Sequence, residues 1–137
     1  MKHKKLIFGL AVFTALGTTL YWLLVFTGVF PLIEYVPGYK TWFWSFPLAD
    51  AWIVATSTLL AVALKRNSLK TAAIFGFLTS SAMIFLALNG LLFGINTGMI
   101  FMLILDEIIE ICIKIYCLVV GVFFITSFSK IITLTKE

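Results

Sequence analysis

A group of charged residues interrupts the apolar run at 98–128, and this combination restricts the fold more than any other feature of the chain. A charged side chain is costly inside a lipid bilayer because it loses its hydration. Asp106, Glu110 and Lys114 follow one another at intervals of four residues, so a helix places them on one face. Glu107 lies three residues before Glu110 and joins the same broad face. We therefore expect a membrane helix with one polar stripe, which the other helices shelter from lipid.

Composition points to the same class of protein. Hydrophobic residues make up 62% of the chain, whereas a typical soluble domain has about 45–50%. A soluble fold of this size would have too few polar residues to cover its surface. The formal net charge of +4 is better explained by orientation signals in membrane loops than by nucleic-acid binding, because no basic patch is interleaved with aromatics. We expect a lipid bilayer around the chain and no nucleic-acid partner.

Apolar runs separated by turn residues predict an all-α fold, a bundle of four transmembrane helices in a single domain covering residues 1–137. The predicted spans are 6–30, 47–64, 71–93 and 99–128. Most basic residues then lie on one side, namely Lys2, Lys4, Lys5, Lys65, Arg66, Lys70, Lys130 and Lys136. Lys40 falls on the other side. Since cytoplasmic loops carry the excess of Lys and Arg, we expect a cell-membrane protein with both termini in the cytoplasm.

The segment 31–47 is a predicted loop that is rich in aromatic residues. Trp and Tyr favour the headgroup region of a bilayer, where the ring is half-wet. Two interpretations stay open, an interfacial anchor and a lid over a cavity. Because Trp42 and Trp44 alternate with Phe43, they need not point the same way. We expect one of them to pack over the acidic stripe and the other to contact lipid headgroups.

The polar stripe predicts either a ligand site or a structural network. Glu110 and Lys114 have the favoured order for an ion pair between residues four apart on a helix. Asp50 falls near the start of the second predicted helix, where a carboxylate also suits the first turn. The depth of Asp106 and Glu107 in the bilayer stays open. If the stripe is a structural network, we expect it to be joined to Asp50, Asn89 or Tyr116. If it is a ligand site, the ligand-binding candidates are Asp50, Asp106, Glu107, Glu110, Lys114, Trp42 and Trp44.

Metal, cofactor and catalytic motifs are not evident in the sequence. His3 is the only histidine and lies in the basic tail, and no Cys/His cluster occurs. Cys112 and Cys117 are five residues apart on one predicted helix, so they cannot pair with each other there, and we expect buried thiols. We expect no metal, no cofactor and no catalytic residue. An enzyme acting on lipid is the weakest of three hypotheses, because no phosphate loop or nucleophile–base motif is present.

The stretch Trp42-Phe43-Trp44-Ser45-Phe46-Pro47-Leu48-Ala49-Asp50 resembles one that opens the second helix of small, uncharacterised four-helix bacterial membrane proteins. The order of features is also loosely similar to the sterol-isomerase-like four-helix membrane fold, whose cavity uses acids and aromatics to hold cationic or sterol ligands. That fold's catalytic sites use histidine, which these predicted helices lack. The resemblance implies a four-helix bundle with an acidic, aromatic cavity.

Two main functional hypotheses follow. In the first, the cavity binds or transports a small cationic or amphipathic ligand. In the second, the chain is a structural or accessory subunit, and the polar stripe pairs with another membrane protein or with a second copy of the chain. A stripe that faces the bundle interior favours the first hypothesis, and a stripe that faces outward favours the second.

Overall fold

The computed structural model describes residues 1 and 3–134, and over this range the chain is helical with no strand. The elements are α1 (Lys4–Phe26), α2 (Tyr39–Phe43), α3 (Pro47–Lys65), α4 (Leu69–Thr97), the 3₁₀ turn η1 (Met99–Phe101) and α5 (Leu105–Leu134). Four segments, Lys4–Phe26, Tyr39–Lys65, Leu69–Thr97 and Leu105–Ile131, are long and apolar enough to cross a membrane. These helices suggest a multi-pass membrane protein, in agreement with the composition.

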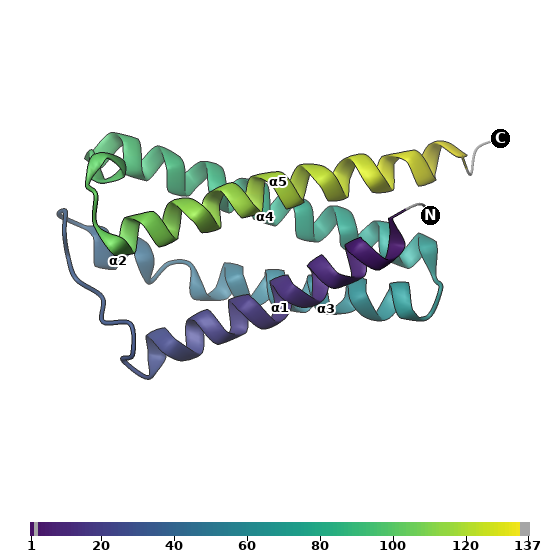
Figure 1. Ribbon diagram of the computed structural model, residues 1–137, viewed down its shortest axis with the longest axis horizontal. Coiled ribbons are helices and arrows are strands. Elements are labelled where there is room, and N and C mark those ends of the chain that lie inside the picture. The colour runs from purple at the N-terminus through teal and green to yellow at the C-terminus, as the bar shows by residue number, and fades with distance from the viewer. Residues whose placement is uncertain (2, 135–137) are drawn as a thin grey trace.

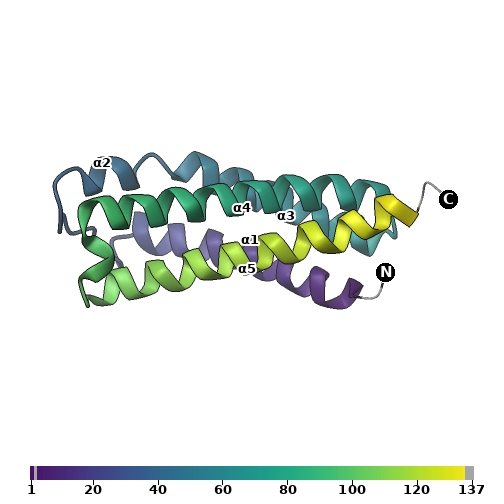
Figure 2. The same cartoon turned by 90° about the horizontal axis from the view of Figure 1, so that it is seen from above.

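The four long helices lie side by side, with the start of α1 and the end of α5 at one end of the bundle and α2 at the other (Figure 1). We call these the terminal end and the α2 end. Neighbours in the chain pack against each other: α1 on α3, α3 on α4, and α4 on α5. In the described part of the chain, α1 and α5 share no comparable packing interface. The two views place α1 and α5 on one side of the bundle and α3 and α4 on the other (Figure 2).

Several helix boundaries differ from those predicted. The first helix covers Lys4–Phe26 rather than 6–30, because the chain turns at Gly28, whose φ of +76° is left-handed. The second begins at Pro47 as predicted and ends at Lys65 rather than Leu64. The short helix α2 in the aromatic loop was not predicted.

The third and fourth helices differ more. The third covers Leu69–Thr97 rather than 71–93 and continues through the predicted turn at 94–98, ending where Gly98 adopts a φ of +72°. Gly94 therefore lies inside a helix, where a Cβ would be in ordinary contact with Ile100 and Glu107, at 3.4 and 3.5 Å. The fourth helix covers Leu105–Leu134 rather than 99–128, because η1 and three residues outside any helix precede it.

The terminal end of the bundle is a tightly packed core. Phe124 and Phe128 of α5 are fully buried. Opposite them, Ala72, Gly76 and Ser80 of α4 are buried, and these small residues at every fourth position form a ridge that permits close helix packing. A Cβ on Gly76 would lie only 2.2 Å from the Phe128 ring, so the ring occupies the space that glycine leaves.

The α2 end is closed by a cluster of aromatic side chains. Tyr39 and Phe43 of α2 are buried, and the Phe43 ring centroid lies 5.2 Å from that of Trp22 on α1. On the opposite side of α2, the Trp42 ring stacks on Phe93 of α4 at a centroid distance of 4.2 Å. Aromatic pairs of this kind contribute roughly 0.5–1.5 kcal/mol beyond their buried area. The cluster therefore fastens α2 across the ends of α1 and α4.

Candidate functional site

Beneath α2, between the four long helices, lies a cavity of about 560 Å³. Its lining is mostly apolar and comes from α1, α2, α3, α4 and α5. Asp50 of α3 and Glu110 and Lys114 of α5 bring charge to this surface. At the terminal side the cavity is limited by Thr14 and Tyr116, whose hydroxyl oxygens are 2.8 Å apart. The volume falls in the range of about 300–1,000 Å³ that is usual for small-molecule sites.

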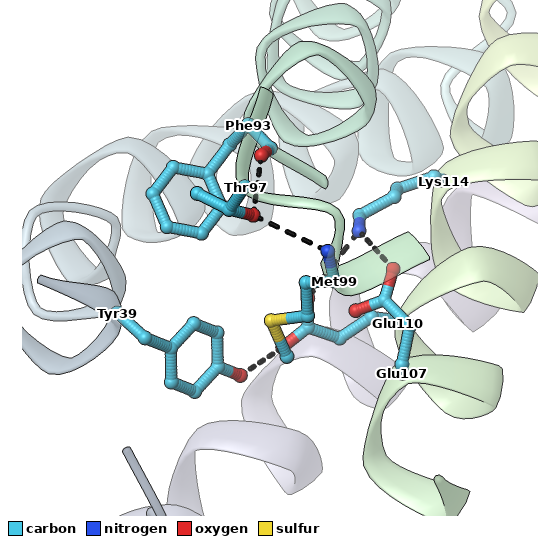
Figure 3. Close-up of polar contacts among 7 residues, drawn as sticks. All are labelled: Tyr39, Phe93, Thr97, Met99, Glu107, Glu110 and Lys114. Carbon is cyan, nitrogen blue, oxygen red and sulfur yellow. Dashed lines mark hydrogen bonds and ion pairs between the residues drawn. The ribbon is translucent and has the colours of Figure 1, made fainter. Parts of the chain in front are cut away.

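Lys114 forms two ion pairs within α5. Its Nζ lies 3.4 Å from Oε1 of Glu107 and 3.4 Å from Oε2 of Glu110 (Figure 3). The pair with Glu110 was predicted from the spacing, and the structure contains it. Lys114 has 7% of its surface exposed and Glu107 has 0%. The lysine stem fits because Gly90 of α4 has no side chain: a Cβ there would lie 2.9 Å from Cε of Lys114.

The two glutamates of this group differ in their other contacts. Glu110 accepts a hydrogen bond from the Tyr39 hydroxyl of α2 (Figure 3). Oε2 of Glu107 is buried and has no hydrogen-bond partner among the described residues. A buried carboxylate oxygen without a partner costs free energy. The group therefore combines one ammonium with two carboxylates, and one carboxylate is incompletely satisfied.

Asp50 carries the third carboxylate near the cavity. It lies in the first turn of α3, as predicted, but the described residues show no side-chain cap there. Instead Oδ2 of Asp50 accepts a hydrogen bond of 2.7 Å from Nε1 of Trp22 on α1. Trp22 thus holds one oxygen of a carboxylate that lines the cavity.

The two tryptophans of the aromatic loop point to different places. Trp42 lines the cavity, and its Nε1 is buried with no hydrogen-bond partner in the described chain. Trp44 is 48% exposed, does not line the cavity, and stacks on Phe26 with ring centroids 5.8 Å apart. This agrees with the expectation that the two rings diverge. Contact of Trp44 with lipid headgroups stays a prediction.

Asp106 lies outside the cavity. Its Oδ2 accepts a hydrogen bond of 2.9 Å from the hydroxyl of Tyr35, in the loop before α2. This bond stabilises the neutral phenol and raises the pKa of Tyr35 above its ordinary value. Of the seven candidates, the structure gathers Asp50, Glu110, Lys114 and Trp42 at the cavity, places Glu107 behind Lys114, and leaves Asp106 and Trp44 outside it.

Several residues of the site were not predicted from the sequence. Tyr39 and Trp22 bind Glu110 and Asp50, yet neither stands out in the sequence from the other aromatics. The expected burial of both cysteines was wrong for Cys112, which is exposed, and Cys117 is half-buried. Both thiols are free, and both line the cavity. Apolar residues on a membrane helix face lipid as readily as protein, so apolar character does not predict burial in such a helix.

Within the described residues, no three His, Cys, Asp or Glu side chains are grouped so that they could hold a metal ion. No family model, curated protein or solved structure matches the chain. The resemblance to small four-helix membrane proteins therefore stays a prediction.

Proposed function

We propose that this chain is a multi-pass membrane protein that binds a small amphipathic cation in the cavity beneath α2. The observation that supports this most is the imbalance of charge around an otherwise apolar space. Lys114 is shared by two carboxylates, and the carboxylate of Asp50 has Trp22 as its described partner. If all four groups are ionised, three negative charges face one positive charge. A cation in the cavity offsets that excess, because opposite charges attract strongly where water is scarce.

The neutral walls of the cavity suit the same class of ligand. Tyr21, Trp22 and Trp42 contribute aromatic rings to the lining. A cation near the face of such a ring gains about 0.5–2 kcal/mol. Aliphatic side chains such as Ile53, Leu86 and Ile113 also line the cavity and suit the hydrocarbon part of an amphipathic molecule. Binding of this kind is also the first step of transport, so the proposal covers a carrier for such cations.

The position of the polar stripe supports a ligand over a protein partner. Glu107 and Lys114 are buried within a single chain and pair with each other there. The stripe faces the bundle interior, so it needs no second protein to shelter it. The alternative, an accessory subunit, is favoured by one other observation: Asn89, in the last third of α4, is exposed. A polar amide on the outside of a membrane helix can bind a neighbouring helix.

For orientation, we propose that both termini are cytoplasmic and that the α2 end faces outward. The described basic residues support this, since Lys4, Lys65 and Lys130 lie toward the terminal end. Lys2 and Lys136, which entered the same prediction, lie outside the described residues. Reporter fusions after residues 40, 67 and 137 test the orientation. An external signal after residue 67 would overturn it.

Binding is tested by the intrinsic fluorescence of Trp22 and Trp42, which line the cavity. Protein in lipid nanodiscs is titrated with dodecyltrimethylammonium and, separately, with dodecyl sulfate. We expect a saturable change with the cation and none with the anion. The double change Asp50→Asn with Glu110→Gln keeps both hydrogen-bond acceptors but removes both charges, so the cation should bind about tenfold more weakly or worse.

Asp106→Asn is the matched control for this experiment. Asp106 is also an acid of α5, one turn from Glu110, but it does not line the cavity. This variant should bind the cation as the unmodified protein does. Equal responses to the cation and the anion, or an unchanged affinity in the double variant, would contradict the proposal.

A further inference from the structure

The cavity has an opening on one side, between α1 and α5. Lining residues on both helices are exposed there: Phe13 is 61% exposed on α1, and Ile109 and Ile113 are 37% and 41% exposed on α5. Gly17 and Cys112 are also exposed lining residues. This is the side on which the described chain shows no extended helix–helix packing. The mouth is therefore formed by the first and last helices.

The other sides of the cavity are closed. At the α2 end, Trp42 stacks on Phe93 and the Tyr39 hydroxyl donates a hydrogen bond to Glu110, so α2 closes this end of the cavity. At the terminal side, the Thr14 and Tyr116 hydroxyls meet and bridge α1 to α5. The back is formed by α3 and α4, which pack against each other. Helix α2 thus blocks access from water at the α2 end of the bundle. The lateral mouth faces outward between α1 and α5, toward lipid if the bundle spans a membrane.

The chemistry of the mouth differs from that of the interior. Its exposed residues are uncharged and mostly apolar, whereas Asp50 and Glu110 lie among the residues that line the inside. An apolar mouth suits a hydrocarbon chain, and an acidic interior suits a positive head. One molecule with both parts matches the two regions at once.

We infer that the occupant is a lipid-like cation with one positive head and at least one hydrocarbon chain, and that it enters sideways from the bilayer between α1 and α5. This inference depends on the proposed function, and it specifies the ligand class and the route. The head lies near Asp50 and Glu110, and the chain remains in the mouth beside Gly17. A free cation without a chain leaves the mouth empty and binds more weakly.

Gly17 allows a direct test of the route. A Cβ at Gly17 meets nothing within 4 Å, so a larger side chain there fills the mouth without disturbing the packing. Gly9 is the matched control: it also lies exposed on α1, a Cβ there also meets nothing within 4 Å, and it does not line the cavity. Gly17→Phe and Gly9→Phe therefore place the same ring on the same helix, either inside or outside the mouth.

The experiment compares dodecyltrimethylammonium binding in nanodiscs for the unmodified protein, Gly17→Phe, Gly9→Phe and Asp50→Asn. We expect Gly17→Phe to weaken binding about tenfold or more and Gly9→Phe to leave it unchanged. Weaker binding in Asp50→Asn together with unchanged binding in Gly17→Phe would overturn the lateral route and leave the proposed function standing. Unchanged binding in both variants would overturn the proposed function as well.

A chemical modification made after folding tests the route independently of any folding defect in Gly17→Phe. In a Cys117→Ala background, Cys112 is the remaining cysteine of the chain, and it lies exposed in the mouth. Alkylating Cys112 with maleimides of increasing length should weaken cation binding progressively. Binding that is independent of the length of the adduct would contradict entry through this mouth.

Discussion

The terminal end and the α2 end of the bundle use the same residue, glycine, in opposite ways. At the terminal end, the space left by Gly76 is filled by the Phe128 ring, and helices α4 and α5 meet closely. At the α2 end, the space at Gly90 holds the stem of a charged lysine, and the space at Gly17 holds nothing. One end is a dry core, and the other is a cavity with acids in its wall.

The contrast between the packed terminal end and the hollow α2 end suggests that different parts of the chain provide stability and the proposed binding. Interior packing at the terminal end resembles that of any helical core and needs no ligand. The α2 end keeps an unfilled volume and, if its acids are ionised, an excess of negative charge, both of which destabilise a protein unless a ligand offsets them. In the proposed function, the terminal end holds the bundle together while the α2 end is left available for a ligand.

The largest expected effect concerns Lys114 at the α2 end. Lys114→Met leaves Glu107 and Glu110 without their shared cation, so the free energy of unfolding should fall by about 3–5 kcal/mol. Adding Glu107→Gln should restore most of the loss. If Glu110 and Lys114 formed an isolated ion pair, replacing both by leucine would restore stability. We expect Glu110→Leu with Lys114→Leu not to restore it, because Glu107 then stays buried without an ion-pair partner. Unfolding in bicelles measures the stability of each variant. If Lys114→Met lowered the free energy of unfolding by less than about 1 kcal/mol, the ion pairs of Lys114 would contribute no more than exposed ones.

The next effect concerns the hydrogen bond between Trp22 and Asp50. Trp22→Phe keeps an aromatic ring but removes the donor to the carboxylate, so unfolding should become easier by about 1.5–3 kcal/mol. Trp44→Phe is the control, because Trp44 is half exposed and forms ring contacts without a described hydrogen bond to an acid. Equal effects of the two changes would show that Asp50 does not depend on Trp22.

A smaller effect is expected at the terminal end. Gly76→Leu forces new atoms against the Phe128 ring and should destabilise the protein by about 1–3 kcal/mol. Gly9→Leu meets open space and should not destabilise it. Thermal unfolding in detergent compares the two. If Gly76→Leu proves as harmless as Gly9→Leu, the terminal end is looser than described, and the contrast between the two ends fails.

The smallest effect concerns the contact between Asp106 and Tyr35. Asp106→Asn preserves an acceptor for the Tyr35 hydroxyl, so the unfolding midpoint should hardly change. The pKa of Tyr35 should fall toward its ordinary value, because the negative acceptor that raises it is gone. Difference absorbance against Tyr35→Phe isolates the titration of Tyr35. A large fall in stability would place Asp106 inside the polar group of α5 rather than beside it.

Much of the fold follows from periodicity and composition. Four apolar helices, the packing ridge of α4 and the ion pair of Glu110 with Lys114 all depend on local spacing, which a sequence displays directly. Helix ends were less predictable. Gly94 suggested a turn but lies inside α4, and the helix ends only at Gly98, which adopts a left-handed φ.

The candidate site was only partly predictable for a related reason. Glu107 has the same spacing signal as its neighbours, and only the packing of α4 against α5 shows that it is the most buried acid of the group. Tyr39 and Trp22 reach Glu110 and Asp50 across large sequence separations, which no local pattern reveals. The lateral mouth depends on which helix pair fails to pack, a property of the whole bundle.

The central claim is that the α2 end binds an amphipathic cation, and the most direct measurement is a crystal structure grown in a lipid mesophase with a bromoalkyl trimethylammonium. We expect density for the trimethylammonium head beside Asp50 and Glu110 and an anomalous bromine peak between α1 and α5. A head bound elsewhere, or the same cavity filled equally well by a bromoalkyl sulfate, would contradict it.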